Sequence, residues 1–244
     1  AYAQTNWNSV SNGNLGMAAV ALMNVYPDIC TEILENAFNG LSYFLPVYAN
    51  GGGFGEGPGY WTYATKYLAY FMASCENTFG TDYGIFNTSG ISETAYFMPY
   101  MTGGKVGFNF HDSSEVNETS PELLYLGKRG GYAAPMQKYR LYMVKNSLSA
   151  SNVYDMLWYD PDLKSDTELP FDRKFDNIAT ASFRSAWEDA DCTYAGIHAG
   201  SINDGHPQLD MGDFVLDALG ERWACELAME DYSYEGYFGD FRWT

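Results

Sequence analysis

The sequence has few basic residues and few histidines. Its 244 residues include 13 Lys and Arg against 31 Asp and Glu, which gives a net charge of −18, and it has three His. Such a charge repels phosphate backbones and anionic membrane surfaces at long range. Nucleic acid is therefore not an expected partner.

Long apolar runs and a signal-peptide pattern are also absent. No stretch reaches the roughly 18 apolar residues of a transmembrane helix, and the first residues, AYAQTNWNSV, lack a basic start and an apolar centre. We therefore expect no membrane partner. The chain starts in a loop-like segment without Met and ends in GDFRWT, which resembles the middle of a strand. We therefore expect a fragment of a longer protein.

The four cysteines are widely spaced, at positions 30, 75, 192 and 225, and form no CxxC pair. This spacing indicates buried thiols rather than a disulfide framework or a zinc ribbon. No phosphate-binding loop, Rossmann glycine pattern or Ser-His-acid order stands out. Nucleotide-dependent and serine-hydrolase chemistry therefore lack a sequence signal.

The sequence does contain a helical periodicity in its first part. Residues 15–26 are apolar on nearly all sides and residues 29–45 carry an apolar stripe, so that with Pro27 between them they predict a helical hairpin. Six glycines in residues 51–59 predict a loop, which a helix over 60–79 follows.

The rest of the chain changes from helical to strand patterns. Residues 101–120 are polar and predict a long connection, and a last helix is predicted over 121–148. After residue 170, short β-branched or aromatic segments alternate with turn residues, as in antiparallel strands. The order predicts an α+β fold, with an α-helical domain over 1–150 and the start of a β-sandwich over 151–244. Because this sandwich would end at an unpaired edge, we expect a second copy or a complementing chain to cover it.

His206 lies in NDGHPQLDMGDF, a loop-like segment between predicted strands. A loop histidine can transfer protons or can be purely structural, and the residues alone leave both interpretations open. Zinc requires three or four ligands, so one histidine makes a poor zinc site. Asp210 and Asp213 are predicted to orient the loop through hydrogen bonds to its backbone.

Tyr60, Tyr63 and Tyr67 are three and four residues apart and predict a row of hydroxyls on one helix face. Tyrosines at this spacing are commonly core residues, although a tyrosine near a helix N-terminus can also act as a base. Glu56 either favours the start of this helix or contacts a sugar hydroxyl. The asparagines of TNWNSVSNGN either form turns and caps or hydrogen-bond a substrate carboxylate.

Five segments spread over most of the chain occur in a specific order. They are NWNSVSNGNLGMAAVAL, EGPGYWTYATKYL, FNFHDS, FRSAW and HPQLDMGDFVLDALGERWACEL. Together they resemble the heparinase II/III-like family of polysaccharide lyases. The resemblance implies an incomplete α/α toroid followed by an antiparallel β-sandwich, with the active site in the cleft between them, and a periplasmic or secreted bacterial setting.

The family's reaction is β-elimination on a uronic-acid-containing glycan. The uronate carboxylate is neutralised, a base removes the C5 proton, and an acid protonates the leaving oxygen at C4. The resemblance implies Asn6 as the carboxylate neutraliser, Tyr60 or Tyr67 as base and acid, and His206 as the partner in proton transfer. Five further residues are expected to bind the substrate: Trp7, Asn12, Glu56, Trp61 and Tyr63. The expected partner is an acidic polysaccharide or oligosaccharide, and the chemistry requires no cofactor.

The sequence departs from the family pattern at two histidines. Trp7 stands where many members have His after the asparagine, and Gln208 replaces the second His of an H-x-H-x-D motif. In relatives with a structural zinc that His is a ligand, so a zinc ion here would depend on Gln208 and Glu226, with a third ligand beyond Thr244. These departures leave a catalytically silent carbohydrate-binding relative as an alternative.

A second alternative is an inverting glycoside hydrolase on a helical toroid, with Glu56 and Asp112 as its two carboxylates. Substrate charge is a separate question. Recognition of sulfated heparin would require Lys and Arg in the cleft, and 13 such residues in the chain are few. Either basic residues lie outside this chain, or the substrate is a less charged uronate glycan, or the protein binds without cleaving.

Overall fold

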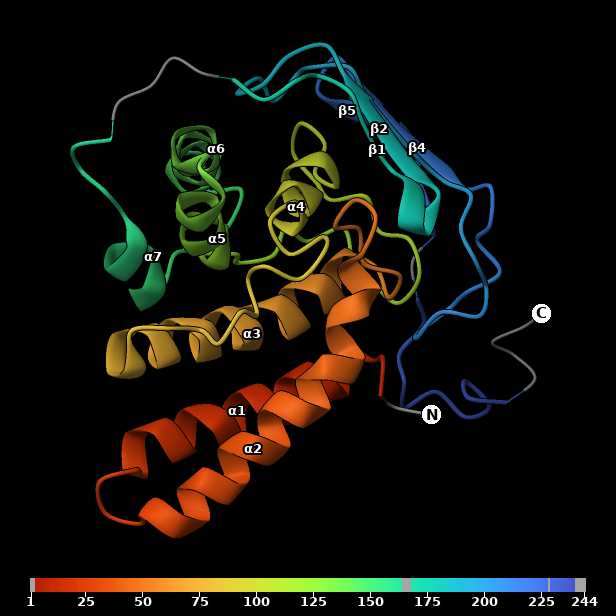
Figure 1. The fold of residues 1–244 in the computed structure, drawn as a ribbon. Coiled ribbons are helices and arrows are strands. Elements are labelled where there is room, and N and C mark those ends of the chain that lie inside the picture. The colour runs from red at the N-terminus through yellow and green to blue at the C-terminus, as the bar shows by residue number, and fades with distance from the viewer. Residues whose placement is uncertain (1–2, 164–167, 228, 240–244) are drawn as a thin grey trace.

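The computed structural model describes residues 3–163, 168–227 and 229–239, and it consists of a helical part followed by one sheet (Figure 1). The helices are α1 (Asn6–Leu22), α2 (Pro27–Phe44), α3 (Pro58–Phe79), α4 (Phe97–Tyr100), α5 (Glu122–Gly130), α6 (Ala133–Lys145) and α7 (Val153–Trp158), with 3-10 turns η1 (Leu45–Tyr48), η2 (Thr94–Tyr96) and η3 (Asp176–Ile178). The strands are β1 (Arg173–Phe175), β2 (Thr180–Arg184), β3 (Tyr194–His198), β4 (Phe214–Ala218) and β5 (Glu221–Ala224). Helices followed by antiparallel strands confirm the predicted α+β class.

The first two helices form the predicted hairpin, and α3 packs on α1 (Figure 1). Pro27 opens α2, where its fixed backbone angle suits the first turn, and Gly80 ends α3 in the left-handed conformation with φ 75°. The apolar core between these helices includes Phe44, Trp61 and Phe71, all fully buried. This packing fixes the start of α1 relative to the start of α3.

The first helix begins earlier than the sequence predicts, at Asn6. Asparagine competes with the helix for backbone hydrogen bonds, so a run of them favours turns and caps. In the structure the Asn12 amide instead donates to the carbonyl of Asn8, one turn earlier in the helix, at 3.0 Å. Ser9 donates to the carbonyl of Ala64 on α3 at 2.8 Å. Packing against α3 therefore outweighs the local preference.

The helix predicted over 121–148 is divided into two. Gly131, with φ 80°, ends α5, and α6 begins at Ala133. The connection over 101–120 is irregular as predicted, apart from one isolated bridge. Because α7 follows residue 150, helices extend past the predicted boundary between the two parts. Of the helices that the structure describes, none combines the length and apolarity needed to cross a bilayer.

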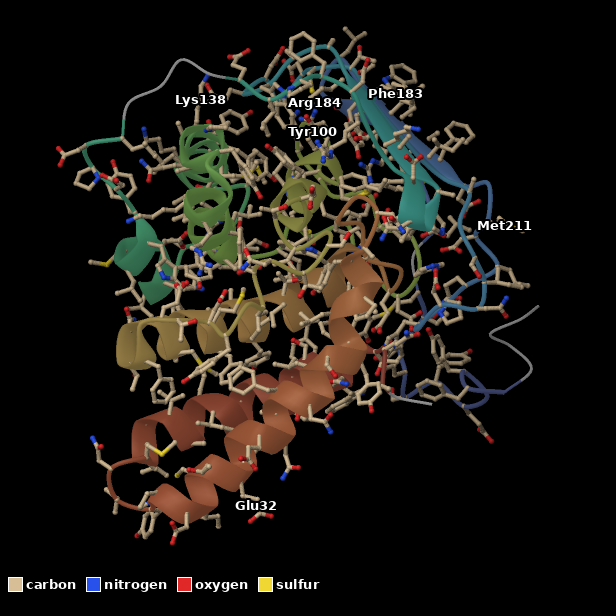
Figure 2. The ribbon with its side chains drawn as sticks, in the orientation of Figure 1. Glu32, Tyr100, Lys138, Phe183, Arg184 and Met211 are labelled. Carbon is tan, nitrogen blue, oxygen red and sulfur yellow. The ribbon has the colours of Figure 1, made fainter. Side chains whose placement is uncertain are left out.

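The strands form one antiparallel sheet in the order β1-β2-β3-β4-β5. The face towards the helices is rich in polar side chains, including the buried Ser182, Arg184 and His198. The Arg184 guanidinium donates to the carbonyl of Pro99 at 2.8 Å, and in Figure 2 it lies near Tyr100, on the helical side of the sheet. The sheet therefore packs on the helices through hydrogen bonds as well as apolar contacts.

The opposite face of the sheet is apolar. Phe183, Ile197 and Phe214 are 50%, 42% and 56% exposed, and Ile197 pairs with Phe214 across β3 and β4. A second sheet would cover this face in the predicted sandwich, and the residues that the structure describes form one sheet. Residues 240–244, in the segment predicted as a further strand, lie outside the described residues.

Candidate active site

Three distant segments meet where the helical part contacts the sheet part. Asn6 opens α1, Glu56 lies in the glycine-rich loop before α3, and His206 lies in the loop between β3 and β4. Gly205 permits this approach, because a Cβ atom there would lie 2.7 Å from the Glu56 carboxyl carbon. The predicted asparagine, glutamate and histidine are thus brought together.

Asn6 holds the Glu56 carboxylate. Its backbone N–H donates to Oε1 at 2.9 Å, and its side-chain amide donates to Oε2. The same amide nitrogen lies 3.3 Å from Nε2 of His206. Burial raises the pKa of Glu56, and the hydrogen bonds from Asn6 and the charge of His206 oppose that shift. The Asn6 amide therefore stands between a buried carboxyl and an imidazole.

The other nitrogen of His206 faces Asp112. Nδ1 lies 3.1 Å from Asp112 Oδ2 and 3.1 Å from the Tyr232 hydroxyl. A carboxylate beside Nδ1 favours the tautomer with its proton there, which leaves Nε2 unprotonated on the side of Asn6. His206 also has a left-handed backbone with φ 55°, a costly conformation that clusters at functional sites.

Asp112 is buried and accepts hydrogen bonds from several donors. Its Oδ2 accepts from the Tyr232 hydroxyl at 2.7 Å, and its Oδ1 accepts from the Tyr237 hydroxyl at 2.9 Å and from the Gln208 amide. Gly57, with φ 88°, makes room for the segment that carries Asp112, because a Cβ atom at position 57 would collide with that segment. The carboxylate oxygens are engaged within the protein, so Asp112 is placed to orient His206.

Tyr60 covers His206. The two rings are stacked, with centroids 3.7 Å apart and an interplanar angle of 12°, and the Tyr60 hydroxyl lies 2.7 Å from that of Tyr232. Because the Tyr232 hydrogen is directed to Asp112, Tyr60 donates in the contact between the tyrosines. Burial raises the pKa of Tyr232, and its hydrogen bonds with Tyr60 and Asp112 add to the shift.

The other predicted catalytic and substrate-binding residues lie apart from this cluster. Tyr63 and Tyr67 contact each other along α3, with ring centroids 5.7 Å apart. Trp61 is fully buried, and its indole N–H donates to a threonine at 2.7 Å. Trp7 is exposed to solvent on α1, and the Asn12 amide donates back into α1. Of the two tyrosines predicted as base and acid, Tyr60 is the one that contacts His206.

Gln208 and Glu226 fit a metal ion poorly. The Gln208 amide nitrogen faces Asp112 and Tyr237, and a Glu226 carboxylate oxygen accepts from Asn109 at 3.2 Å. These two side chains are fewer than the three or four ligands that zinc takes. No catalytic step is therefore assigned to a metal at these two residues.

Tyr232 and Tyr237 are functional candidates that the sequence did not reveal. They lie after β5 in EDYSYEGYFG, an acidic and aromatic segment without helix or strand periodicity. No pattern in it predicts contact with a residue more than a hundred positions earlier. The signal for Asp112 was present in FNFHDS, one of the five segments of the family resemblance.

A cleft of 330 Å³ borders the cluster at Glu56. It is lined by the start of α1, η1, the glycine-rich loop and the loop before His206, with Thr5, Val47, Phe54, Asn177 and Asp204 among its residues. The charged side chains in this lining are Glu56 and Asp204, both acidic. Burial raises the pKa of Asp204 as well. The cleft is thus polar and, in the described chain, without Lys or Arg.

The sequence matches no protein-family model and no curated protein. Solved structures are similar in fold. Heparan sulfate lyase HepC from Pedobacter heparinus is 14% identical with a TM-score of 0.60, covering 92% of this chain and 33% of that one. A heparinase III gene product is 17% identical with a TM-score of 0.59 (93% and 34%), and a further heparinase III is 15% identical with a TM-score of 0.58 (92% and 35%). The chain spans about a third of the length of these proteins. It therefore has the fold of that third of a heparinase III, which confirms at the level of the fold the resemblance found in the sequence.

Proposed function

We propose that this chain carries the active site of a polysaccharide lyase that cleaves a uronate glycan by β-elimination. The observation that supports the proposal is the convergence of Asn6, Tyr60 and His206 from three segments far apart in the sequence. The neighbours in fold are described as a heparan sulfate lyase and heparinases. Because one fold can serve several activities, the side chains carry more weight than the likeness.

The first requirement is to neutralise the uronate carboxylate. The Asn6 amide can donate to that carboxylate without adding charge, and it already lies between Glu56 and His206. Glu56, whose pKa burial raises, can hold a proton and share a hydrogen bond with the same group. Donors aimed at the charge that develops on the enolate-like state supply the largest part of such catalysis.

The second requirement is a base and an acid in opposite protonation states. The Asp112 carboxylate at Nδ1 leaves His206 Nε2 unprotonated, so His206 takes the C5 proton, and Asp112 stabilises the resulting imidazolium. Tyr60 stacks on the imidazole and its hydroxyl is a hydrogen-bond donor, so this hydroxyl protonates the leaving oxygen at C4. The contact with Tyr232 holds the Tyr60 hydroxyl in place.

The substrate that we propose is a uronate glycan with little or no sulfate. Sulfate groups are recognised mainly by Arg and Lys, and the charged residues that line the cleft are acidic. The net charge of −18 adds long-range repulsion against heavily sulfated chains. Carboxylates of a less charged polymer require only the amide and carboxyl groups already at the site.

The two alternatives have weaker support. An inverting hydrolase would need a carboxylate that can activate water, whereas Asp112 already accepts from Tyr232, Tyr237 and Gln208. A silent relative was suggested by Trp7 and Gln208 in place of two histidines. Gln208 has a defined role as a donor to Asp112, so the replacement leaves the His206 network complete.

The experiment is an activity assay on the longest form of the protein that its gene encodes. Alginate, chondroitin, heparan sulfate and rhamnogalacturonan are each incubated with it while the ultraviolet absorbance of unsaturated uronate is followed. We expect product from a weakly sulfated or unsulfated substrate and none with His206→Ala. Saturated reducing ends without a double bond would indicate a hydrolase. Binding without product, unchanged in His206→Ala, would indicate the silent relative.

A further inference from the structure

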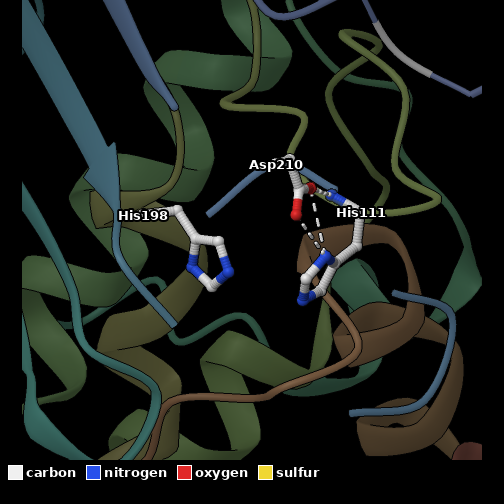
Figure 3. A group of neighbouring side chains, drawn as sticks. All are labelled: His111, His198 and Asp210. Carbon is white, nitrogen blue, oxygen red and sulfur yellow. Dashed lines mark hydrogen bonds and ion pairs between the residues drawn. The ribbon is translucent and has the colours of Figure 1, made fainter. Parts of the chain in front are cut away.

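A second histidine cluster adjoins the candidate active site. His111 from the 101–120 connection, His198 at the end of β3, and Asp210 from the loop that carries His206 are 1%, 0% and 3% exposed. Each can offer one ligand atom such that the three atoms lie within 4.8 Å of one another. Figure 3 shows the His198 ring and the Asp210 carboxylate directed towards His111. Among His, Cys, Asp and Glu of the described ranges, this is the group of three with metal-ligand spacing.

The cluster contains buried polar atoms that the described residues leave without hydrogen bonds. These atoms are His111 Nε2, His198 Nε2 and Asp210 Oδ1. Asp210 Oδ1 lies 3.1 Å from His111 Nδ1, but it is the other oxygen, Oδ2, that has hydrogen-bond geometry to that nitrogen. Buried polar atoms are rarely left unpaired, so three in one place point to a missing partner.

The hydrogen bonds of Thr180 favour one tautomer of His198. The Thr180 hydroxyl donates its single hydrogen to the carbonyl of Ile178 at 3.1 Å and lies 2.7 Å from His198 Nδ1. With its hydrogen on that carbonyl, the hydroxyl is an acceptor for Nδ1–H, and this tautomer leaves a bare lone pair at Nε2. Stacking on Phe110, with centroids 4.2 Å apart, keeps the ring in this orientation. Metal-binding histidines are commonly presented in this way, with the second nitrogen donating to an oxygen.

His111 and Gly200 complete the arrangement. The backbone N–H of His111 donates to Asp210 Oδ2 at 2.5 Å, which ties the carboxylate to the histidine. His111 has a left-handed backbone with φ 55°. At position 200 a Cβ atom would come within 2.9 Å of His198 Nε2, so glycine leaves the space beside that nitrogen open.

We propose that His111, His198 and Asp210 bind a divalent transition-metal ion, for which zinc is the best match. Two imidazoles and one carboxylate form a ligand set that zinc uses, with a fourth position for water. Tetrahedral ligands at 2.0–2.1 Å from zinc stand roughly 3.3 Å apart, so binding would draw the three side chains closer together. The site is distinct from Gln208 and Glu226, and its existence does not depend on the proposed lyase activity.

The ion would have a positioning role. Asp112 directly follows His111, and His206 precedes Asp210 by four residues in the same loop. One ion would therefore connect β3 with the two segments that carry Asp112 and His206. Holding these segments together would keep the 3.1 Å contact between Asp112 Oδ2 and His206 Nδ1 in register.

The test is zinc binding by the untagged protein without substrate. Metal is removed with a chelator, zinc is added back, and affinity and stoichiometry are measured by calorimetry and elemental analysis. We expect one zinc ion per chain at this site and a higher melting temperature with zinc. His198→Gln and Asp210→Asn should each lose more affinity than the ~10–100-fold expected for a change outside the ligand set. His206→Ala should keep its zinc.

Circular dichroism checks that each variant is folded, and X-ray absorption of the zinc-loaded natural protein counts the imidazoles without any variant. Two imidazoles per zinc support the site. No zinc binding by the natural protein, no imidazole in the coordination shell, or zinc that His206→Ala loses and His198→Gln retains would each overturn it. Because no glycan is present, these results are separate from the outcome of the lyase assay.

Discussion

His206 and His198 belong to neighbouring clusters and have opposite surroundings. Both nitrogens of His206 face polar groups, and its side chain is 23% exposed beside the cleft. His198 is fully buried, hydrogen-bonded at Nδ1 and unpaired at Nε2, and burial lowers its pKa to about 4, with a further contribution from His111. A partnered, partly exposed imidazole can exchange protons with a substrate. A buried, neutral one offers a lone pair that suits a fixed ion.

The largest expected effects are on kcat, from substitutions of His206 and of Tyr60, which stacks on it. Tyr60→Phe and His206→Ala each remove a proton-transfer group, so kcat should fall by about 10²–10⁴-fold in the lyase assay. Tyr43→Phe, at an exposed tyrosine on α2, is the matched control. An equal fall in Tyr67→Phe alone, with Tyr60→Phe fully active, would show that the wrong tyrosine has been assigned.

Glu122, in the helical part, shows what burial without a hydrogen-bond partner does to a carboxyl outside the cluster of His111, His198 and Asp210. Glu122 is fully buried, both of its carboxylate oxygens lack hydrogen-bond partners, and burial raises its pKa from 4.5 to about 8. Because the folded state holds this proton more tightly, the contribution of Glu122 to stability is largest below pH 4.5 and declines as the pH rises towards 8.

Glu122→Gln should remove that decline and raise the free energy of unfolding at pH 8 by on the order of 3–5 kcal/mol. Denaturant unfolding at acidic and alkaline pH measures the free energy of unfolding of each variant. Glu32→Gln, at an exposed glutamate on α2, is the control. The same pH slope in both variants would mean that the Glu122 carboxyl is solvated or paired.

A smaller effect, on zinc affinity, is expected from the loss of the Thr180 hydroxyl that contacts His198 Nδ1. Thr180→Val removes the acceptor of Nδ1–H but none of the three ligands, so zinc affinity should fall by about 10–100-fold. Ser182→Ala on the same strand is the control, because the Ser182 hydroxyl is buried without a hydrogen-bond partner. Unchanged zinc affinity in Thr180→Val would contradict the proposed tautomer of His198.

The smallest effect is expected at the rim of the His206 network. Tyr237→Phe removes one of the donors to Asp112, so kcat should fall roughly tenfold while zinc binding is unchanged. Tyr234→Phe, at an exposed tyrosine nearby, should match the natural protein. A loss of zinc binding in Tyr237→Phe would mean that the His206 network and the zinc-binding group of His111, His198 and Asp210 form one cluster.

The sequence predicts the strongly periodic parts of this fold. The hairpin of α1 and α2, the helix α3 and the later strands follow from apolar spacing, whereas the start of α1 at Asn6 depends on packing against α3. The sheet shows a clearer limit. Alternation separates an apolar from a polar face, but here Arg184 and His198 face the helices and Phe183 faces away, so a rule that buries apolar side chains assigns the faces in reverse.

The candidate active site was only partly predictable for a related reason. The family resemblance implied Asn6, His206 and either Tyr60 or Tyr67, and nothing in the sequence distinguished the two tyrosines. The group of His111, His198 and Asp210 has no motif spacing, because the fold alone brings its first two members together from positions 87 residues apart. Tertiary contacts of this kind are invisible to local periodicity.

The apolar outer face of the sheet has a consequence for the behaviour of residues 1–244 when they are alone in solution. Phe183, Ile197, Phe214 and Trp223 are between 42% and 66% exposed and would associate between molecules if nothing opposed them. The net charge of −18 provides that opposition through mutual repulsion. Colloidal stability should therefore fail near the isoelectric point of 4.3, or in sulfate salts that screen charge and strengthen apolar association, well before the helices and strands unfold.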